Sequence, residues 1–148
     1  LVVAGFFRGL SYELLAAGAL LLTKGARFVG TNPDVSFPSE YGRLPGAGAV
    51  QAFLSAATGI EPEIVGKPER IMYDQAVKRL GGSRETTAMV GDRLNTDMAG
   101  ALNAGLRTIL VLSGITQPDD LDDSSIQPEF VFDDIVALRQ ALENGKLA

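Results

Sequence analysis

Short apolar runs along the chain alternate with longer segments in which apolar residues recur every three or four positions. The short runs have the length and composition of buried strands, and they cover residues 1–5, 27–31, 63–65, 87–90, 107–112 and 130–132. The longer segments have helical periodicity, and they cover residues 12–24, 46–58, 68–80, 96–104 and 134–142. Strands and helices in this alternating order predict an α/β fold with a doubly wound parallel sheet.

Individual residues indicate where the helices end and which faces they bury. Ser11 is a suitable N-cap for the first helix, and Asn95 or Thr96 for the helix after the fourth strand. Three helices carry an apolar stripe that we expect to face a core. These stripes are Val50, Phe53, Leu54 and Ala57; Met72, Ala76, Val77 and Leu80; and Ile135, Leu138 and Leu142.

Residues 32–45 interrupt the alternation with three prolines, Gly42 and several turn-forming residues. A connection of this length predicts a functional loop or a crossing between domains. We therefore place a domain boundary there and expect two parts, residues 1–42 and residues 43–148.

The composition removes several kinds of chemistry from consideration. The 148 residues include neither cysteine nor histidine. This excludes disulfides, zinc-thiolate sites, thiol nucleophiles, Ser-His-Asp catalysis and histidine metal ligands. Carboxylates, lysines and hydroxyls remain as candidate catalytic groups.

The formal net charge is -5, and residues 108–138 contain many acids but no Lys or Arg. A nucleic-acid surface needs clustered cations, so none is expected. Residues 119–123 resemble a solvated loop and helix start, since the Gly and closing Glu of a calcium loop are missing. The most apolar segment, residues 14–22, is too short to span a bilayer, and no signal peptide is visible. We expect no membrane association and a cytoplasmic location. The chain opens inside a strand pattern, so we also expect further residues upstream.

The sequence GDRLNTD after the fourth strand places two carboxylates, Asp92 and Asp97, at a strand-to-helix turn. In open α/β sheets, ligands bind at the carboxyl ends of the strands. Oxygen donors at such an edge suit Mg²⁺, which takes one or two carboxylates together with waters and a substrate phosphate. The alternative is an ordinary turn in which an Asp does no more than cap a helix.

Lys67 stands in a GKP turn that leads into the third helix, with Pro68 in the first turn. Free backbone N–H groups at a helix start attract anions, so Lys67 is a candidate phosphate anchor. The alternative is a solvated surface lysine. Lys67 and Asp92 would place a cation and an anion at the same edge of one sheet.

The GKP turn followed about 25 residues later by GDRLNTD resembles the third and fourth motifs of the haloacid dehalogenase (HAD) superfamily. The segments RFVGTNPD, LPGAG, AGLRTILVLSG and PEFVFDDI are similar to its nitrophenylphosphatase, or NagD-like, branch, which carries a large α/β cap. The similarity covers essentially the whole chain. It implies that residues 1–42 are the end of the cap domain and that residues 43–148 are the C-terminal half of a HAD-like Rossmannoid core.

The resemblance also implies roles for individual residues. Asp92 matches the Mg²⁺ ligand, and Asp97 the supporting acid that holds a metal-bound water or the catalytic lysine. Lys67 matches the residue that neutralises the phosphoryl group and the nucleophile. Asn32 and Asp34 fall in the cap loop over the substrate, near Phe37, where specificity contacts are expected. The implied substrate is a small phosphorylated metabolite, and the cap implies a homo-oligomer.

The family also uses a DxD nucleophile motif on its first strand and a Ser or Thr in a second motif, and neither is present. The first Asp of the chain is Asp34, in the cap connection. We therefore expect sugar-phosphate or aryl-phosphate hydrolysis, through an aspartyl-phosphate, only in a longer parent protein, and an isolated chain that is inactive. The missing N-terminal half is needed to complete the site. Without the nucleophile strand, the strand at residues 87–90 has an unpaired edge, which predicts pairing with another chain or poor stability.

Two other functions agree with parts of this pattern. A non-catalytic module that binds a phosphorylated ligand or a partner could keep the same fold. A receiver-like signalling domain also combines acids and a lysine on a parallel sheet, but the order of the GKP and GDR segments is wrong for that class.

Overall fold

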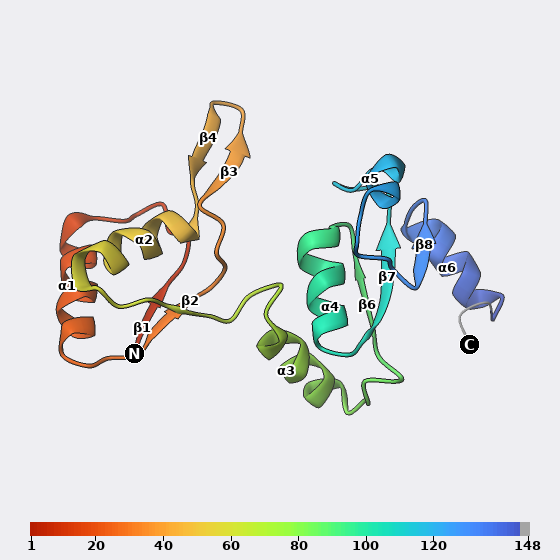
Figure 1. Cartoon of the computed structure of the whole chain (residues 1–148), viewed down its shortest axis with the longest axis horizontal. Coiled ribbons are helices and arrows are strands. Elements are labelled where there is room, and N and C mark those ends of the chain that lie inside the picture. Colours follow the sequence, from red (N-terminus) through yellow and green to blue (C-terminus); the bar gives the residue numbers. More distant parts are fainter. Residues whose placement is uncertain (146–148) are drawn as a thin grey trace. The chain divides into compact units, whose positions relative to one another are not determined.

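The computed structural model describes residues 1–145, which fold into two compact units, Leu1–Gly66 and a second unit that begins at Lys67 (Figure 1). Each unit contains helices and a three-stranded sheet whose strands are all parallel, which confirms the predicted α/β class. The parallel strands of the described residues form two three-stranded sheets, one in each unit.

The sheet of the first unit has the order β1-β2-β5, formed by β1 (Val2–Ala4), β2 (Phe28–Gly30) and β5 (Glu63–Ile64). Helices α1 (Tyr12–Thr23) and α2 (Ala47–Thr58) pack against each other, and both contact β1. One cluster of buried side chains joins these elements; it comprises Ala4, Leu22, Phe28 and Leu54.

The ends of the two helices follow from local chemistry. Ser11 caps α1 as predicted, since its side chain accepts a hydrogen bond from the Leu14 N–H. Gly59 ends α2 with a φ of 72°, a left-handed conformation that favours glycine. The predicted stripe of α2 is only partly correct, because Leu54 is buried and Val50 half-buried, while Phe53 and Ala57 are exposed.

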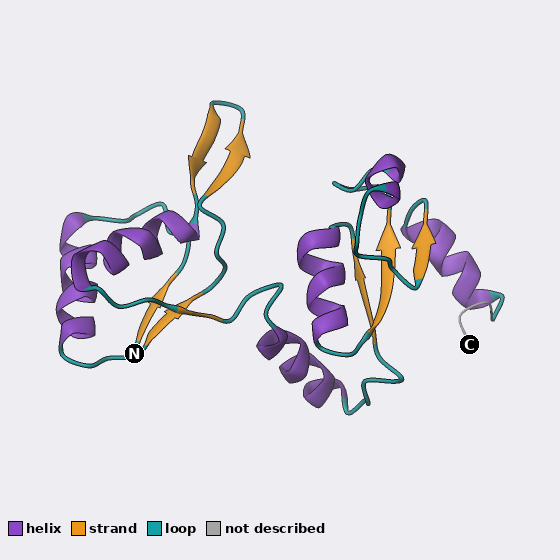
Figure 2. Ribbon diagram, viewed as in Figure 1, coloured by secondary structure: helices purple, strands orange, loops and turns teal. Residues whose placement is uncertain are grey.

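Residues 32–45 contain a β-hairpin that the sequence analysis missed. Strands β3 (Ser36–Ser39) and β4 (Gly42–Pro45) pair antiparallel, and Figure 2 shows the hairpin projecting from the remainder of its unit. Pro38 is tolerated within β3 because each strand of a two-stranded hairpin has one edge that needs no partner. An irregular connection was therefore the wrong prediction for this segment.

The first unit ends at Gly66, whereas the sequence analysis placed the domain boundary after Gly42. Helix α2 packs on α1, β1 and β2, and β5 pairs with β2, so these contacts hold residues 43–66 within the first unit. The assignment of a cap and a core to the two parts of the chain stays a prediction.

The second unit has the strand order β6-β7-β8, formed by β6 (Ala88–Gly91), β7 (Arg107–Val111) and β8 (Phe130–Phe132). Its helices are α3 (Arg70–Leu80), α4 (Ala99–Asn103), α5 (Pro118–Asp122) and α6 (Ile135–Glu143), and the π-helical turn η1 (Leu94–Met98) precedes α4. The centre of β7 is buried, as its continuous apolar run predicts.

The core of the second unit differs from the predicted helix stripes. In α3 the buried side chain is Tyr73 and Val77 is half-buried, whereas Leu80 is 74% exposed. In α6, Leu138 is buried, but Ile135 and Leu142 are exposed. Periodicity identified the apolar residues of these helices, but it did not show which of them are buried against other parts of the described chain.

The start of the helix after β6 also differs from the prediction. Neither Asn95 nor Thr96 caps it, because the helical turn begins at Leu94 with Arg93 as the N-cap residue. The start of α6 agrees with the helical segment predicted from residue 134, and the Asp134 carboxylate caps it by accepting hydrogen bonds from the Val136 and Ala137 N–H groups.

Each three-stranded sheet has two outer strands that pair on one side within residues 1–145, β1 and β5 in the first unit and β6 and β8 in the second. The unpaired edge predicted for residues 87–90 is thus present in the described chain, where β6 pairs only with β7. No helix in residues 1–145 has the length and hydrophobicity needed to cross a membrane. A cytoplasmic location stays a prediction.

Candidate active site

Asp92 directly follows β6, where the strand ends at Gly91. Its carboxylate oxygen Oδ2 accepts a hydrogen bond of 2.9 Å from the Ile115 N–H, and its carbonyl accepts one of 3.0 Å from the Thr116 N–H. Gly114 permits this approach, because a Cβ at that position would overlap the Asp92 carboxylate. The loop after β7 therefore closes around Asp92 and fixes its orientation.

Asp97 lies in η1 and is the most buried charged side chain of this region, with 4% of it exposed. Its Oδ1 atom is 2.7 Å from the Lys67 Nζ atom. Its Oδ2 atom accepts hydrogen bonds of 3.2 Å from the backbone N–H groups of Asp92 and Arg93. One carboxylate thus connects the lysine to the loop that carries Asp92.

Lys67 opens the second unit, in the turn before α3. The helix itself begins at Arg70 with Glu69 as the N-cap residue, so Lys67 and Pro68 precede the first helical turn instead of forming it. The Lys67 side chain is 41% exposed and forms an ion pair, which distinguishes it from a freely solvated lysine. Its amine can therefore meet a ligand from solvent while Asp97 restrains its position.

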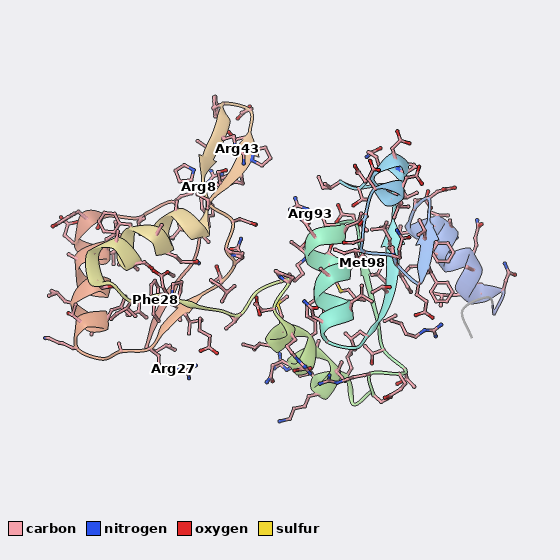
Figure 3. The ribbon with its side chains drawn as sticks, viewed as in Figure 1. Arg8, Arg27, Phe28, Arg43, Arg93 and Met98 are labelled. Atoms are coloured by element: carbon pink, nitrogen blue, oxygen red, sulfur yellow. The ribbon has the colours of Figure 1, made fainter. Side chains whose placement is uncertain are left out.

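Two further parts of the second unit support Asp97 from inside. Met98, the next residue of η1, is completely buried, whereas Arg93 at the start of the turn is exposed (Figure 3). The hydroxyl of Tyr73, on α3, lies 3.1 Å from the Thr96 carbonyl and 3.3 Å from the Asp97 carbonyl. Burial, reinforced by the negative charge of Asp97, raises the pKa of Tyr73 to about 12. Tyr73 was not among the residues predicted from the sequence, although a polar aromatic residue one helical turn into α3 was a usable signal.

Asp92 fits a hard metal ion, although it cannot enclose one alone. Hydrogen bonds within residues 1–145 reach only its Oδ2 atom, so Oδ1 is open for coordination. In the same residues, no group of three or more acidic, His or Cys side chains gathers to hold a metal. Mg²⁺ suits such a partial site, because it often takes one or two carboxylates and fills its other positions with water and phosphate oxygens.

The other predicted site residues lie in the first unit. The Asn32 amide donates a 2.8 Å hydrogen bond to Asp34 Oδ2. These two side chains and Phe37 line a cavity of about 230 Å³, and the ring of Phe37 meets Phe6 edge to face with centroids 5.0 Å apart. The structure therefore groups Asn32, Asp34 and Phe37 in one unit, and Lys67, Asp92 and Asp97 in the other.

Comparisons with known proteins give consistent results. A family model described as HAD-hydrolase-like matches residues 64–138. The 5'-nucleotidase YutF of Bacillus subtilis is 40% identical over 134 residues, which are 90% of this chain and 52% of that protein. An acid sugar phosphatase of Staphylococcus haemolyticus is 40% identical over 98% of this chain and 56% of its own length.

Solved structures agree with these sequence relatives. A 4-nitrophenylphosphatase from Thermotoga maritima superposes with a TM-score of 0.84 and 42% identity, over 95% of this chain and 54% of that one. A p-nitrophenyl phosphatase from Archaeoglobus fulgidus gives a TM-score of 0.84 at 34% identity, over 94% of this chain and 55% of that one. The chain thus spans about half the length of the relatives it matches.

Proposed function

Because this chain belongs to the HAD-like hydrolases of the NagD/p-nitrophenylphosphatase family, we propose that it supplies the phosphate-binding and metal-binding part of a Mg²⁺-dependent phosphatase. The reaction is hydrolysis of phosphate monoesters. The observation that carries the proposal is the shared carboxylate of Asp97, which binds Lys67 through one oxygen and the Asp92 loop through the other. A cation for the phosphoryl group and an anion for a metal ion are thereby held in one network.

Lys67 stabilises the negative charge on the phosphoryl oxygens during transfer. Its amine is partly exposed and so reaches a ligand, while the 2.7 Å ion pair with Asp97 limits the positions it can take. A charge that is already oriented does not have to reorganise during the reaction, and this is the main source of electrostatic catalysis. Asp97 is therefore proposed as the residue that positions the catalytic lysine.

Asp92 is proposed as the metal ligand, through its open Oδ1 atom. When bound, Mg²⁺ would polarise the phosphoryl oxygens and offset the charge that develops on them. The Ile115 N–H and the Asp97 carboxylate hold the Asp92 side chain and backbone, so this ligand is oriented before the ion arrives.

Small phosphate monoesters are the proposed substrates, in line with relatives named for nucleotides, sugar phosphates and nitrophenyl phosphate. Asn32 and Asp34 are proposed as substrate-binding residues, because their side chains line a cavity with both polar and aromatic walls. A homo-oligomer formed through the first unit is proposed on the resemblance alone.

The isolated chain is proposed to be inactive, because electrostatic groups cannot replace a nucleophile and no strand in residues 1–145 carries the DxD motif of the family. The decisive experiment joins the N-terminal part of YutF, which this chain does not match, to residues 1–148. Mg²⁺-dependent hydrolysis of 4-nitrophenyl phosphate is expected from this chimera and not from the chain alone.

Substitutions in the chimera test the assigned roles. Lys67→Ala and Asp92→Asn should each lower kcat/KM by roughly 100-fold or more, which is typical of removing a preorganised electrostatic group. Lys24→Ala and Asp119→Asn are matched controls at exposed positions and should leave the rate unchanged. Hydrolysis that survives Asp92→Asn would disprove the metal-ligand role. Phosphate and Mg²⁺ binding by a chimera that never turns over would instead support the non-catalytic module.

A further inference from the structure

Tyr73 is a buried polar residue whose role the proposed chemistry leaves open. It is 5% exposed, and its ring packs in a cluster with Ala101, Ala104 and Leu106. A phenylalanine would fill the same space, so packing explains the ring but not the hydroxyl. That hydroxyl is within hydrogen-bond distance of the Thr96 and Asp97 carbonyl oxygens.

The two carbonyls belong to η1, the turn that carries Asp97. Here the Met98 and Ala99 N–H groups bond to carbonyls five residues earlier, those of Arg93 and Leu94. Such a π-helical turn is wider than an α-helical turn and occurs frequently at functional sites. A donor from outside the turn can stabilise carbonyls that this widening displaces. The Tyr73 hydroxyl is placed to act as that donor.

A glycine makes this contact geometrically possible. Gly100 follows η1 on α4, and a Cβ at that position would overlap the Tyr73 hydroxyl and ring. Gly91 has the corresponding role for Asp97, since a Cβ there would overlap the Asp97 side chain. Tyr73 and Asp97 thus both occupy space that is available because the neighbouring residue is a glycine and has no Cβ.

Tyr73 also lies on α3, the helix that follows the Lys67 turn, so its hydroxyl connects this helix to η1, which carries Asp97. We propose that Tyr73 is a positioning residue: its hydroxyl fixes η1 so that the Asp97 carboxylate reaches Lys67 and the Asp92 loop together. This inference rests on the proposed function only where it gives the network of Lys67, Asp92 and Asp97 a role in phosphate hydrolysis. The contacts themselves belong to the second unit and need no substrate.

The protonation of Tyr73 agrees with this role. A hydroxyl can donate to a carbonyl only while it keeps its proton. Burial and the neighbouring Asp97 raise the pKa of Tyr73 to about 12, so the donor is present throughout the neutral range.

The test is amide hydrogen exchange on the 148-residue chain labelled with ¹⁵N, comparing the wild type with Tyr73→Phe. The reporters are the Asp92 and Arg93 N–H groups, which bond to Asp97 Oδ2. Both should exchange about fivefold faster in the variant, the factor expected for losing one net hydrogen bond. The Arg107 and Leu112 N–H groups, which bond to neighbouring strands, should exchange at the wild-type rate.

Val77→Ala is the matched control, because Val77 lies on the same helix and packs on the same cluster. This variant lowers stability without touching the carbonyls, so it should change the exchange of all four amides by a similar factor. If Tyr73→Phe behaves like Val77→Ala, or leaves Asp92 and Arg93 unchanged, the positioning role is wrong. Local acceleration at Asp92 and Arg93 establishes it, even if the chimera with Asp92→Asn keeps its activity and the proposed function fails.

Discussion

The two units share a plan and differ in what stands at the ends of their strands. Each has three parallel strands, and ligands of such sheets bind beyond the carboxyl ends. In the first unit the residues that follow the strands are neutral: Gly5 after β1, Thr31 after β2 and Val65 after β5. In the second unit β6 is followed by Asp92 and β8 by Asp133. Charge at the strand ends, rather than the fold, distinguishes the unit that is proposed to bind a phosphate and a metal ion.

The buried polar residues show the same difference. In the first unit Gln51 is buried and donates to the Ala4 and Asn32 carbonyls, which satisfies backbone groups with a neutral amide. In the second unit the corresponding buried group is Asp97, a charge balanced by Lys67 and two backbone N–H groups. A hollow of about 520 Å³ in the first unit is lined largely by apolar side chains. An apolar cavity can recognise a ligand by its shape, whereas a buried charged group can orient groups that take part in a reaction.

The largest expected effect comes from removing the charged buried group. Asp97→Ala leaves Lys67 and two N–H groups unpaired, and should lower the free energy of unfolding of the second unit by about 3 kcal/mol. Gln51→Ala in the first unit should cost about 1.5 kcal/mol, because only neutral hydrogen bonds are lost. Urea titrations followed by amide signals from each unit measure both values. Equal losses would contradict the contrast between the units.

A second, smaller effect concerns two glycines whose replacement by alanine should change the free energy of unfolding in opposite directions. Gly91→Ala should destabilise the second unit by about 2 kcal/mol, since the added methyl group overlaps the Asp97 side chain. Gly18→Ala, in the middle of α1, meets only ordinary contact at 3.4 Å from a Leu54 methyl group and should stabilise the first unit by about 0.5 kcal/mol. The same urea titrations check the signs. A stabilising Gly91→Ala would show that Asp97 does not need the space.

The smallest effect is a pH dependence confined to the second unit. The pKa of Tyr73 is raised to about 12 from its ordinary value near 10. The folded state therefore retains a proton that the unfolded state loses, so this contribution to stability is complete below about pH 10 and disappears towards about pH 12. The stability of wild type relative to Tyr73→Phe should fall across that window. Tyr41→Phe, at the exposed tip of the hairpin in the first unit, is the control. This variant should lose stability across the same pH window as the wild type.

The sequence predicts the parallel strands well, for a physical reason. The apolar run at residues 130–132 coincides with β8, and that at residues 107–112 contains β7. The centre of β7 is buried, and a buried strand requires apolar residues, so its pattern is easily recognised. The run at β8 predicts the strand correctly although Val131 is partly exposed. Which residues of a helix are buried is harder to predict. An apolar stripe marks the apolar face, but the segments packed against the helix determine which of these residues are covered. Leu80 and Leu142 belong to such stripes and are exposed.

The site could be predicted in part. Asp92 stands out because it directly follows a strand, and Lys67 because it precedes a helix. Their connection through Asp97 could not be read from spacing, since Lys67 and Asp97 are 30 residues apart and η1 is wider than the helix that was expected. The contribution of Tyr73 was hidden for a similar reason, because only the packing of α3 on α4 brings its hydroxyl to the turn.

The hairpin has a practical consequence. At its tip, Ser39 Oγ donates to the Gly42 carbonyl and accepts from the Tyr41 N–H, and Tyr41 itself is 84% exposed. The tip closes its own hydrogen bonds and contributes nothing to the buried cluster of its unit. Short exposed loops of this kind accept foreign peptides with little loss of stability. An epitope or a fluorophore-accepting tag inserted between Glu40 and Tyr41 would therefore report on the first unit while leaving its sheet intact.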